Sequence, residues 1–372
     1  MNFSLATLWH DRNRFLPGVL AVAFSAMLIM LQGGLLLGLF SLTSTPIDHC
    51  DADVWVGHST ATSLDTGRPI SERWVSRVRM EEEVVRAEPY LQGFAVVQKP
   101  DGGSELCTLI GTTLDDDSLG AVRQLTPELR ERLAEPGAIV VDESELGRLG
   151  LSAVGDTAEI FGHRVRLVGV VQGLKSLAAP YVFCSLRTAR LLSDGLRQHQ
   201  TTYVLARCRS APDAQSLAQR LQSEYGVSAH TGPAFSTQTR LHWLLKTKAG
   251  IAGGWTVVLG LIVGAVITSQ TLYAATMASQ REYAVLRALG VPRWRIAGAV
   301  LTQSFWVGGV GVLLALPAAF VLAWLLNLLG VHTVLPPWVL VAAAGLTLFM
   351  AVFSGFVSLR ALRRMEPVDL LR

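Results

Sequence analysis

The chain has 372 residues, of which 50% are hydrophobic and only 16% are charged, with a formal net charge of +3. In soluble domains about a quarter of the residues are charged, and the charges here avoid three windows, 15–47, 249–280 and 296–359. Because one charge at the centre of a membrane helix costs about 2.5–3.5 kcal/mol, such windows indicate membrane spans. The composition excludes an ordinary soluble protein, and the small net charge does not indicate nucleic-acid binding.

The three windows predict four transmembrane helices. A short segment, 1–14, precedes the first span at 15–47, whose apolar stretch is too long for a cleaved signal peptide. The second span is expected at 249–275. The last window is interrupted by Gly330 and by Pro336 and Pro337, so it predicts a helical hairpin. Its two spans are expected at 297–329 and 338–357, followed by a tail at 358–372.

Basic residues near the spans indicate the orientation. They lie in the first segment, in the loop after the second span and in the tail, and they are Arg12, Arg14, Arg281, Arg287, Arg293, Arg295, Arg360, Arg363, Arg364 and Arg372. The turn between the third and fourth spans has none. The positive-inside rule therefore places both termini and the middle loop in the cytoplasm, and residues 48–234 outside it.

The external region, 48–234, is predicted to be an α+β domain. The expected strands are 51–57, 93–98, 105–111, 202–207 and 227–230, and the expected helices are 71–83 and 211–223. The last three of these elements in chain order form a β-α-β unit. An insertion, 121–193, carries its own strands and a short helix, and its pattern indicates a small mixed subdomain.

All four cysteines, Cys50, Cys107, Cys184 and Cys208, lie in this external region. An oxidising compartment would allow disulfides there, and four cysteines allow three connectivities. Cys107 and Cys184 lie in apolar, strand-like runs, which favour free buried thiols at least as strongly. The sequence leaves both states open.

The segment 235–248 is polar, compatible with a helix, and leads directly into the second span. A helix that continued out of the bilayer would act as a mechanical stalk, because it could not tilt without moving the domain attached to it. The alternative is a plain juxtamembrane linker. Trp243, near the predicted membrane boundary, is interpreted as an interfacial anchor.

The cytoplasmic segment 276–296 contains a predicted short helix from Arg281 to Leu289. Glu282 lies in its first turn and Arg287 in its last, which suits the helix dipole. Tyr283 and Leu286 form an apolar edge, and Gly290 with Pro292 ends the helix. Such a helix could lie on lipid or fit a groove of a soluble partner. Its small apolar face and its acidic residue favour the partner.

Four stretches resemble the MacB/FtsX-type ABC transporter permeases. REYAVLRALGVPRWRI resembles their coupling segment, AIVVDESELGRLGLSAVGDTAEIFGHRVRLVGVV their small β-rich periplasmic subdomain, LRALRRMEPVDLLR their tail, and IDHCDADVWV the DevC-like branch. The residues on family positions of the coupling segment are Arg281, Glu282, Leu286, Arg287, Ala288 and Gly290. Tyr283 stands where an aliphatic residue is usual, and Val291 and Pro292 replace the common Ala-Ser or Ala-Thr.

The resemblance implies a fold and a set of partners. The fold is an α-helical membrane domain of four transmembrane helices, with an α+β domain inserted between the first and second. The chain is expected to be a homodimeric permease of the bacterial inner membrane, bound to a separate ABC ATPase. It would export a lipid, glycolipid, peptide or small hydrophobic compound by mechanotransmission, with a periplasmic adaptor and an outer-membrane duct as further partners. No GxxxxGK[ST] phosphate loop occurs in the 372 residues, so another chain has to supply the ATPase.

No catalytic, cofactor or metal site is predicted. The sequence has no HExxH, CxxC or GxSxG motif. Asp48, His49, Cys50 and Asp51 are metal-ligand types, but consecutive residues rarely face one ion, and the acidic run 115–117 is interpreted as a solvated loop. Gln32, Gly33 and Gly34 inside the first span suggest tight packing across a dimer axis.

Two alternative functions remain at this stage. One is an ATPase-driven signal transmitter that regulates a cell-envelope hydrolase. The other is a membrane-anchored sensor or enzyme, which would leave the predicted coupling helix unexplained.

Overall fold

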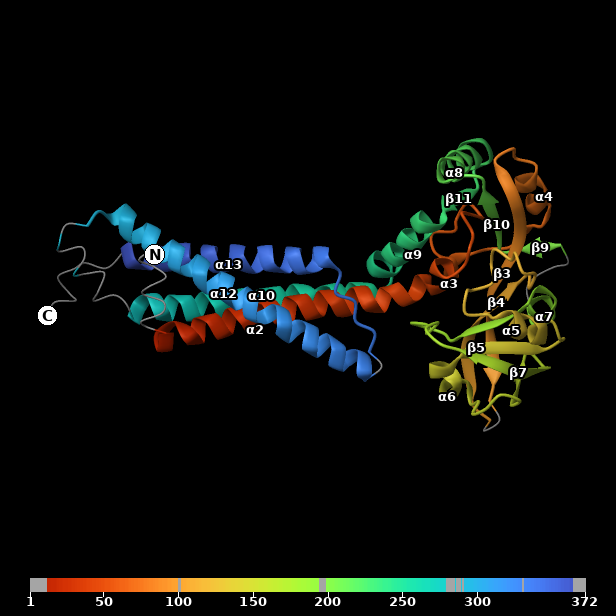
Figure 1. The fold of residues 1–372 in the computed structure, drawn as a ribbon, viewed down its shortest axis with the longest axis horizontal. Coiled ribbons are helices and arrows are strands. Elements are labelled where there is room, and N and C mark those ends of the chain that lie inside the picture. Colours follow the sequence, from red (N-terminus) through yellow and green to blue (C-terminus); the bar gives the residue numbers. More distant parts are fainter. Residues whose placement is uncertain are drawn as a thin grey trace. The chain divides into compact units, whose positions relative to one another are not determined.

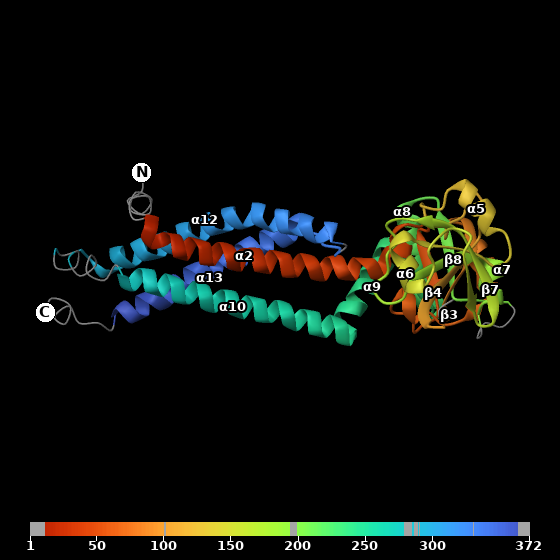
Figure 2. The ribbon, with the colours of Figure 1, turned by 90° about the horizontal axis from the view of Figure 1, so that it is seen from below.

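The structure is a computed structural model that describes residues 12–99, 102–193, 199–278, 285, 289, 291–329 and 331–363. The chain divides into two compact units (Figures 1 and 2). The membrane unit comprises 1–39 and 251–372, and the external unit comprises 40–250.

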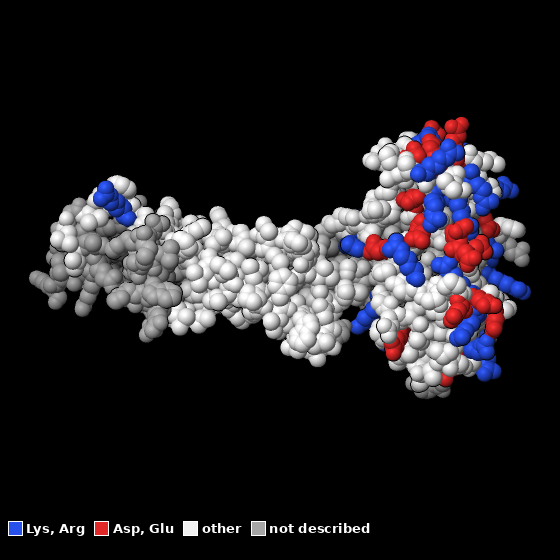
Figure 3. All heavy atoms as spheres, in the orientation of Figure 1, with Lys and Arg blue, Asp and Glu red and all other residues white. Residues whose placement is uncertain are grey.

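The membrane unit contains the predicted four spans. Its helices are α2 (Arg12–Ser41), α10 (Lys248–Ala278), α12 (Arg293–Leu328) and α13 (Pro337–Arg363). Each contains a stretch long and apolar enough to cross a membrane. Figure 3 shows the described surface of these helices almost without charges, whereas basic and acidic side chains intermingle over the external unit. The prediction of an α-helical membrane domain with an inserted α+β domain is confirmed.

Glycines of α2 contact the turn between α12 and α13. The N–H of Val334 donates to the carbonyl of Gly34 at 3.2 Å. A Cβ on Gly38 would lie 2.2 Å from the carbonyl oxygen of His332, so only glycine fits there without a backbone shift. The sequence suggested that Gly34 packs across a dimer axis. The described contacts of Gly34 lie within the chain, and packing across a dimer axis stays a prediction.

The external unit begins with η1 (Leu42–Ser44), α3 (Thr45–Asp48), β1 (Val54–Gly57), η2 (Leu64–Thr66), β2 (Ile70–Ser71), α4 (Arg73–Arg79), β3 (Val84–Gln98) and β4 (Ser104–Thr112). It continues with α5 (Pro127–Leu133), β5 (Ala138–Asp142), η3 (Glu143–Glu145), α6 (Leu146–Leu149), β6 (Thr157–Ile160), β7 (His163–Val171), β8 (Tyr181–Ser185) and α7 (Leu186–Leu191). It ends with β9 (Gln200–Thr201), β10 (Tyr203–Cys208), α8 (Ala211–Tyr225), β11 (Ser228–Thr231) and α9 (Gly232–Lys246).

One nine-stranded sheet organises the unit, in the order β11-β1-β10-β3-β4-β8-β5-β7-β6, and β6 also pairs with β3. The strands from β3 to β6 in this order therefore form a closed ring. The predicted β-α-β unit is present as β10, α8 and β11, but β1 lies between its two strands and pairs antiparallel with both.

The insertion predicted at 121–193 does not have a sheet of its own. Tyr181 of β8 is in register with Thr108 of β4, and Ile160 of β6 is in register with Val97 of β3. The 15-residue strand β3 belongs both to the ring and to the rest of the sheet, because its first half pairs with β10 and its second half with β4. Local periodicity does not reveal such pairing partners, so the predicted boundary missed the contribution of β3 and β4 to the ring.

All four cysteines are free and buried. The sequence left free thiols and disulfides both open, and the structure has free thiols. Cys107 and Cys184 lie in the same apolar cluster, together with Leu109 and Val182 of the ring strands. Burial raises the pKa of the Cys107 thiol to about 12.

Candidate transmission site

The external unit joins the membrane helices through two segments of the chain. One leaves α2 through η1 and α3, and the other enters α10 from α9. Helix α9 contacts both η1 and α3, so the two segments lie side by side within the external unit (Figure 1). Any movement passed along the chain between the two units has to pass through these segments.

Three side chains join the two segments directly, and we call Ser44, Asp48 and Arg240 the connection clamp. Arg240 of α9 donates from Nε to Ser44 Oγ at 2.7 Å and from Nη2 to Asp48 Oδ2 at 2.5 Å. Ser44 Oγ in turn donates to the same Asp48 oxygen at 2.8 Å. The Arg240 and Asp48 side chains are 43% and 31% exposed. Asp48 is the last residue of α3, so the clamp links the end of α3 to the middle of α9.

Further contacts hold α9 to the loop after β1. His242 Nδ1 is hydrogen-bonded to Thr62 Oγ1 at 2.9 Å, and Trp243 Nε1 donates to Asp65 Oδ2 at 2.8 Å. Burial raises the pKa of Asp65, and the Trp243 hydrogen bond opposes that rise. Trp243 was interpreted as a membrane anchor, but its polar end binds this loop instead. Four consecutive residues of α9, 240–243, thus include three that make side-chain bonds to other segments.

The N-terminal end of α9 is held by packing. Phe235 is 1% exposed, and its ring centroid lies 5.5 Å from that of Trp55 in β1 and 5.6 Å from that of Tyr203 in β10. Because these two strands are neighbours in the sheet, the aromatic cluster ties α9 to the core of the external unit.

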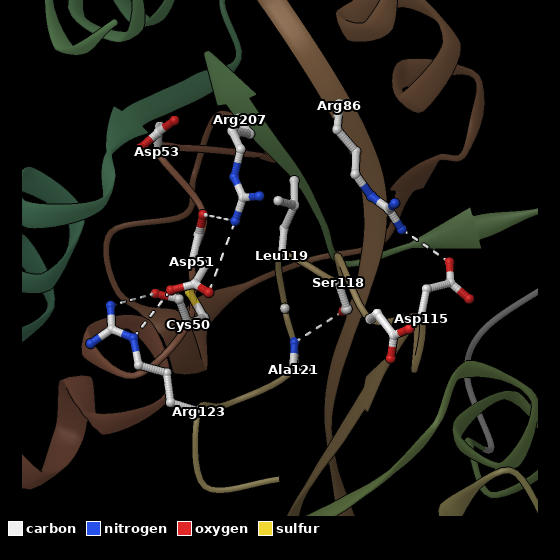
Figure 4. Close-up of polar contacts among 12 residues, drawn as sticks. Cys50, Asp51, Asp53, Arg86, Asp115, Ser118, Leu119, Ala121, Arg123 and Arg207 are labelled. Carbon is white, nitrogen blue, oxygen red and sulfur yellow. Dashed lines mark hydrogen bonds and ion pairs between the residues drawn. The ribbon is translucent and has the colours of Figure 1, made fainter. Parts of the chain in front are cut away.

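The segment after α3 is anchored to the sheet by its acidic residues (Figure 4). Asp51 lies between two arginines, 3.1 Å from Arg123 Nε and 3.9 Å from Arg207 Nη2. Asp53 Oδ2 accepts from the backbone N–H of Cys208 at 2.8 Å. With Asp48 in the clamp, the three aspartates therefore bind α9, the loop before α5 and the end of β10, and the end of β10 is held by both Asp51 and Asp53. Among the described residues no group of three or more His, Cys, Asp or Glu is placed to hold a metal ion.

A buried carboxylate fixes the loop on which this segment rests. Glu88 of β3 is 3% exposed, and its Oε1 accepts from the N–H groups of Leu119 and Gly120 at 2.7 and 2.8 Å and from Ser118 Oγ at 3.0 Å. Leu119 then accepts from the N–H of Asp51 at 2.9 Å. The sequence analysis missed Glu88, although a single acid inside an apolar strand was a signal that could have found it.

The acidic run interpreted as a solvated loop is only partly so. Asp115 is 70% exposed, yet it accepts from Arg86 Nη2 at 3.0 Å. Arg86 also donates from Nε to Glu88 Oε2 at 3.3 Å, so Asp115 adds to the charge balance around the buried Glu88.

The predicted stalk at 235–248 is helical but not continuous with the second span. Helix α9 ends at Lys246, and Thr247 has an extended conformation with ψ of 151°. Its Oγ1 donates to the carbonyl of Trp243 and accepts from the N–H of Gly250 at 3.0 Å, which caps the start of α10. The prediction of one uninterrupted helix is therefore wrong at Thr247, because a threonine cap competes with continued helix.

The predicted ATPase-coupling residues lie outside the described residues. They are Arg281, Glu282, Tyr283, Leu286, Arg287, Ala288 and Gly290. In the same segment, Leu289 donates its N–H to the carbonyl of Val285 at 3.0 Å, and the two side chains are 75% and 54% exposed. The coupling role stays a prediction.

The architecture defines a class of membrane protein, one with a large mixed domain inserted after the first of four spans. Two family descriptions match the chain, the FtsX-like permease C-terminal at residues 255–367 and the MacB-like periplasmic core domain at residues 19–224. The chain therefore belongs to the family of MacB/FtsX-type ABC transporter permeases.

The chain is similar to uncharacterized ABC transporter permeases from two strains of Mycobacterium tuberculosis, each 24% identical over 332 residues, which cover 87% of this chain and 84% of each relative. Among solved structures, the periplasmic region of MacB from Actinobacillus actinomycetemcomitans is 14% identical, covers 51% of this chain and 94% of that one, and has a TM-score of 0.34. The extracellular domain of the noncanonic ABC-type transporter YknZ from Gram-positive bacteria is 13% identical, with coverages of 48% and 98% and a TM-score of 0.32.

Proposed function

We propose that this permease subunit converts ATP hydrolysis by a separate ATPase into movement of its external unit. The result would be export of a lipid, glycolipid, peptide or small hydrophobic compound by mechanotransmission. The observation that carries this proposal is the connection clamp, in which Arg240 bonds to Ser44 and Asp48. It joins the two segments that link the external unit to the membrane helices.

The clamp suits a mechanical role for a physical reason. If the two segments moved independently, displacement of one span would be absorbed in its own segment. Because Arg240 holds them together, and Asp51 and Asp53 hold the first segment to the sheet, displacement of either span would move the sheet as well. Trp243 and Phe235 give the second segment an equivalent anchorage.

The proposed assembly is a homodimer in the bacterial inner membrane, with both termini cytoplasmic and the external unit periplasmic. An ABC ATPase would dock on the coupling segment 276–296. A periplasmic adaptor and an outer-membrane duct are proposed as further partners. The chain itself is proposed to be non-catalytic.

Co-purification with a candidate ABC ATPase tests the docking. The native chain is expected to retain the ATPase, whereas Glu282→Lys and Leu286→Asp release it, because they reverse a charge and place one on the apolar edge of the predicted coupling helix. Leu329→Asp is the matched control, since it makes the same change in the turn after α12 and should retain the ATPase. Retention by both coupling variants would refute the docking site, and no retention by the native chain would remove the main support for the transporter.

A further inference from the structure

Helix α9 has an outer face that the described residues of the external unit leave exposed. Leu241 and Leu245, one helical turn apart, are 48% and 65% exposed. The opposite side of the helix carries the buried residues Phe235, Ser236 and Thr239, which face the external unit. The helix therefore has one side committed to protein contacts and another that presents leucines outwards.

The outer face changes character along the helix. Towards the start of α9 its exposed residues are Ala234 and Thr237, which are small or polar. Towards the end they are Leu241 and Leu245. A helix that paired with a second copy over its whole length would need apolar residues along the whole face. A helix that enters an apolar layer at one end needs them only at that end.

The leucine end adjoins the membrane span. Leu245 lies three residues before Lys248, the first residue of α10, so their Cα atoms are within about 11 Å of each other. The headgroup layer of one leaflet is roughly 5–7 Å thick. The break at Thr247 allows α9 a direction different from that of α10, so its leucine end can lie in this layer.

The charges near the leucine end favour an anionic surface. Lys246 and Lys248 are both exposed and flank Thr247. The segment 232–250 contains no Asp or Glu. Lysines beside an apolar helix face are typical of helices that bind anionic lipid headgroups, because the amines reach the phosphates while the apolar side chains enter the acyl boundary.

We infer that the outer face of α9, formed at its membrane end by Leu241, Leu245 and Lys246, is together with Lys248 at the start of α10 a binding surface for anionic phospholipid headgroups. The segment predicted as a mechanical stalk would then have its base held by the outer leaflet. This inference goes beyond the proposed function and does not depend on an ATPase or a cargo.

Fluorescence quenching tests the inference in the full chain reconstituted in nanodiscs of phosphatidylcholine and phosphatidylglycerol. Leu245→Cys carries an environment-sensitive fluorophore, and the quencher is phosphatidylcholine with a nitroxide on its headgroup. We expect quenching several-fold stronger than at the matched control Thr237→Cys, which lies on the same face two turns away. The unsubstituted chain, whose thiols are all buried, gives the labelling background.

The outcomes separate lipid from a second copy of the chain. Equal quenching at the two positions would overturn the inference, as would an oxidant-induced disulfide between two Leu245→Cys chains without quenching, which would show a contact between copies. If Leu245→Cys does not fold, Leu241→Cys answers the same question. Changing Lys246 and Lys248 to glutamate should lower the quenching in discs with phosphatidylglycerol more than in discs of phosphatidylcholine alone. An equal effect in both would overturn the preference for anionic lipid.

Discussion

Replacing Arg240 by glutamine should loosen both connecting segments without unfolding the external unit. The change removes the ion pair with Asp48 and weakens the bond to Ser44, while it leaves the packing of Phe235 intact. Because the paired side chains are 43% and 31% exposed, solvent screens them, and such a pair contributes about 0.2–1 kcal/mol. A hydrogen bond adds a net of about 0.5–1.5 kcal/mol. The expected loss is therefore about 1–2 kcal/mol against local opening.

Hydrogen exchange measured by mass spectrometry can detect a loss of this size. A change of about 1–2 kcal/mol corresponds to a factor of roughly 5–30 in the population of the open state. We expect exchange to accelerate by this factor in α9 and in residues 42–50, and to stay unchanged in β3 and β10. The core strands open only with the whole unit, whereas the segments can open locally.

A matched control and a double-mutant cycle make the test specific. Arg166→Gln removes the ion pair between Arg166 and Glu135, whose side chains are 54% and 57% exposed, and it should not alter exchange in α9. Asp48→Asn should have little further effect once Arg240 is glutamine, because the two residues act as a pair. Fully additive effects, or no change in α9, would refute the clamp.

Three further predictions concern packing, a buried charge and the thiols. Gly38→Ala should lower the melting temperature, because its Cβ would meet a backbone carbonyl at 2.2 Å, whereas Gly345→Ala, with nothing within 4 Å, should be neutral or stabilising. Glu88→Gln should destabilise the external unit by about 2–3 kcal/mol in thermal or chemical unfolding, because the amide lacks the charge that strengthens the three bonds to Oε1, and its nitrogen cannot accept from Arg86 Nε as Oε2 does. The exposed Glu159→Gln should change nothing measurable. At pH 8, iodoacetamide should modify none of the four buried cysteines in the folded protein and all of them after unfolding, and rapid labelling of the folded protein would contradict their burial.

Features that depend on composition could be predicted from the sequence. The four spans follow from charge-free windows, because a bilayer penalises a charge wherever the chain folds. The strands β1, β10 and β11 and the helix α8 also follow from local patterns. These elements require only that nearby residues alternate or repeat in the expected way.

The connection clamp could not be predicted in the same way. Asp48 and Arg240 are separated by most of the external unit, and neither stands in a motif that names the other. Glu88 and the loop at 118–120 present the same difficulty, because their contact depends on how β3 and β4 pair in the sheet. The ring closure by β6 is a further long-range pairing, and the predicted insertion therefore received the wrong boundary.

Three aspartates, at the end of α3 and just after it, anchor this segment of the chain to the external unit. Asp48, Asp51 and Asp53 are too close in sequence to surround an ion. Asp48 reaches α9, Asp51 reaches Arg123 before α5 and Arg207 of β10, and Asp53 reaches the end of β10. Three anchors in six residues prevent the segment from turning about any one of them. If only Asp48 were bound, the chain leaving α2 could rotate beneath the sheet and dissipate a displacement. With all three bound, a displacement of the kind proposed would carry the sheet with it, because the segment is fixed to α9, to the loop before α5 and to β10.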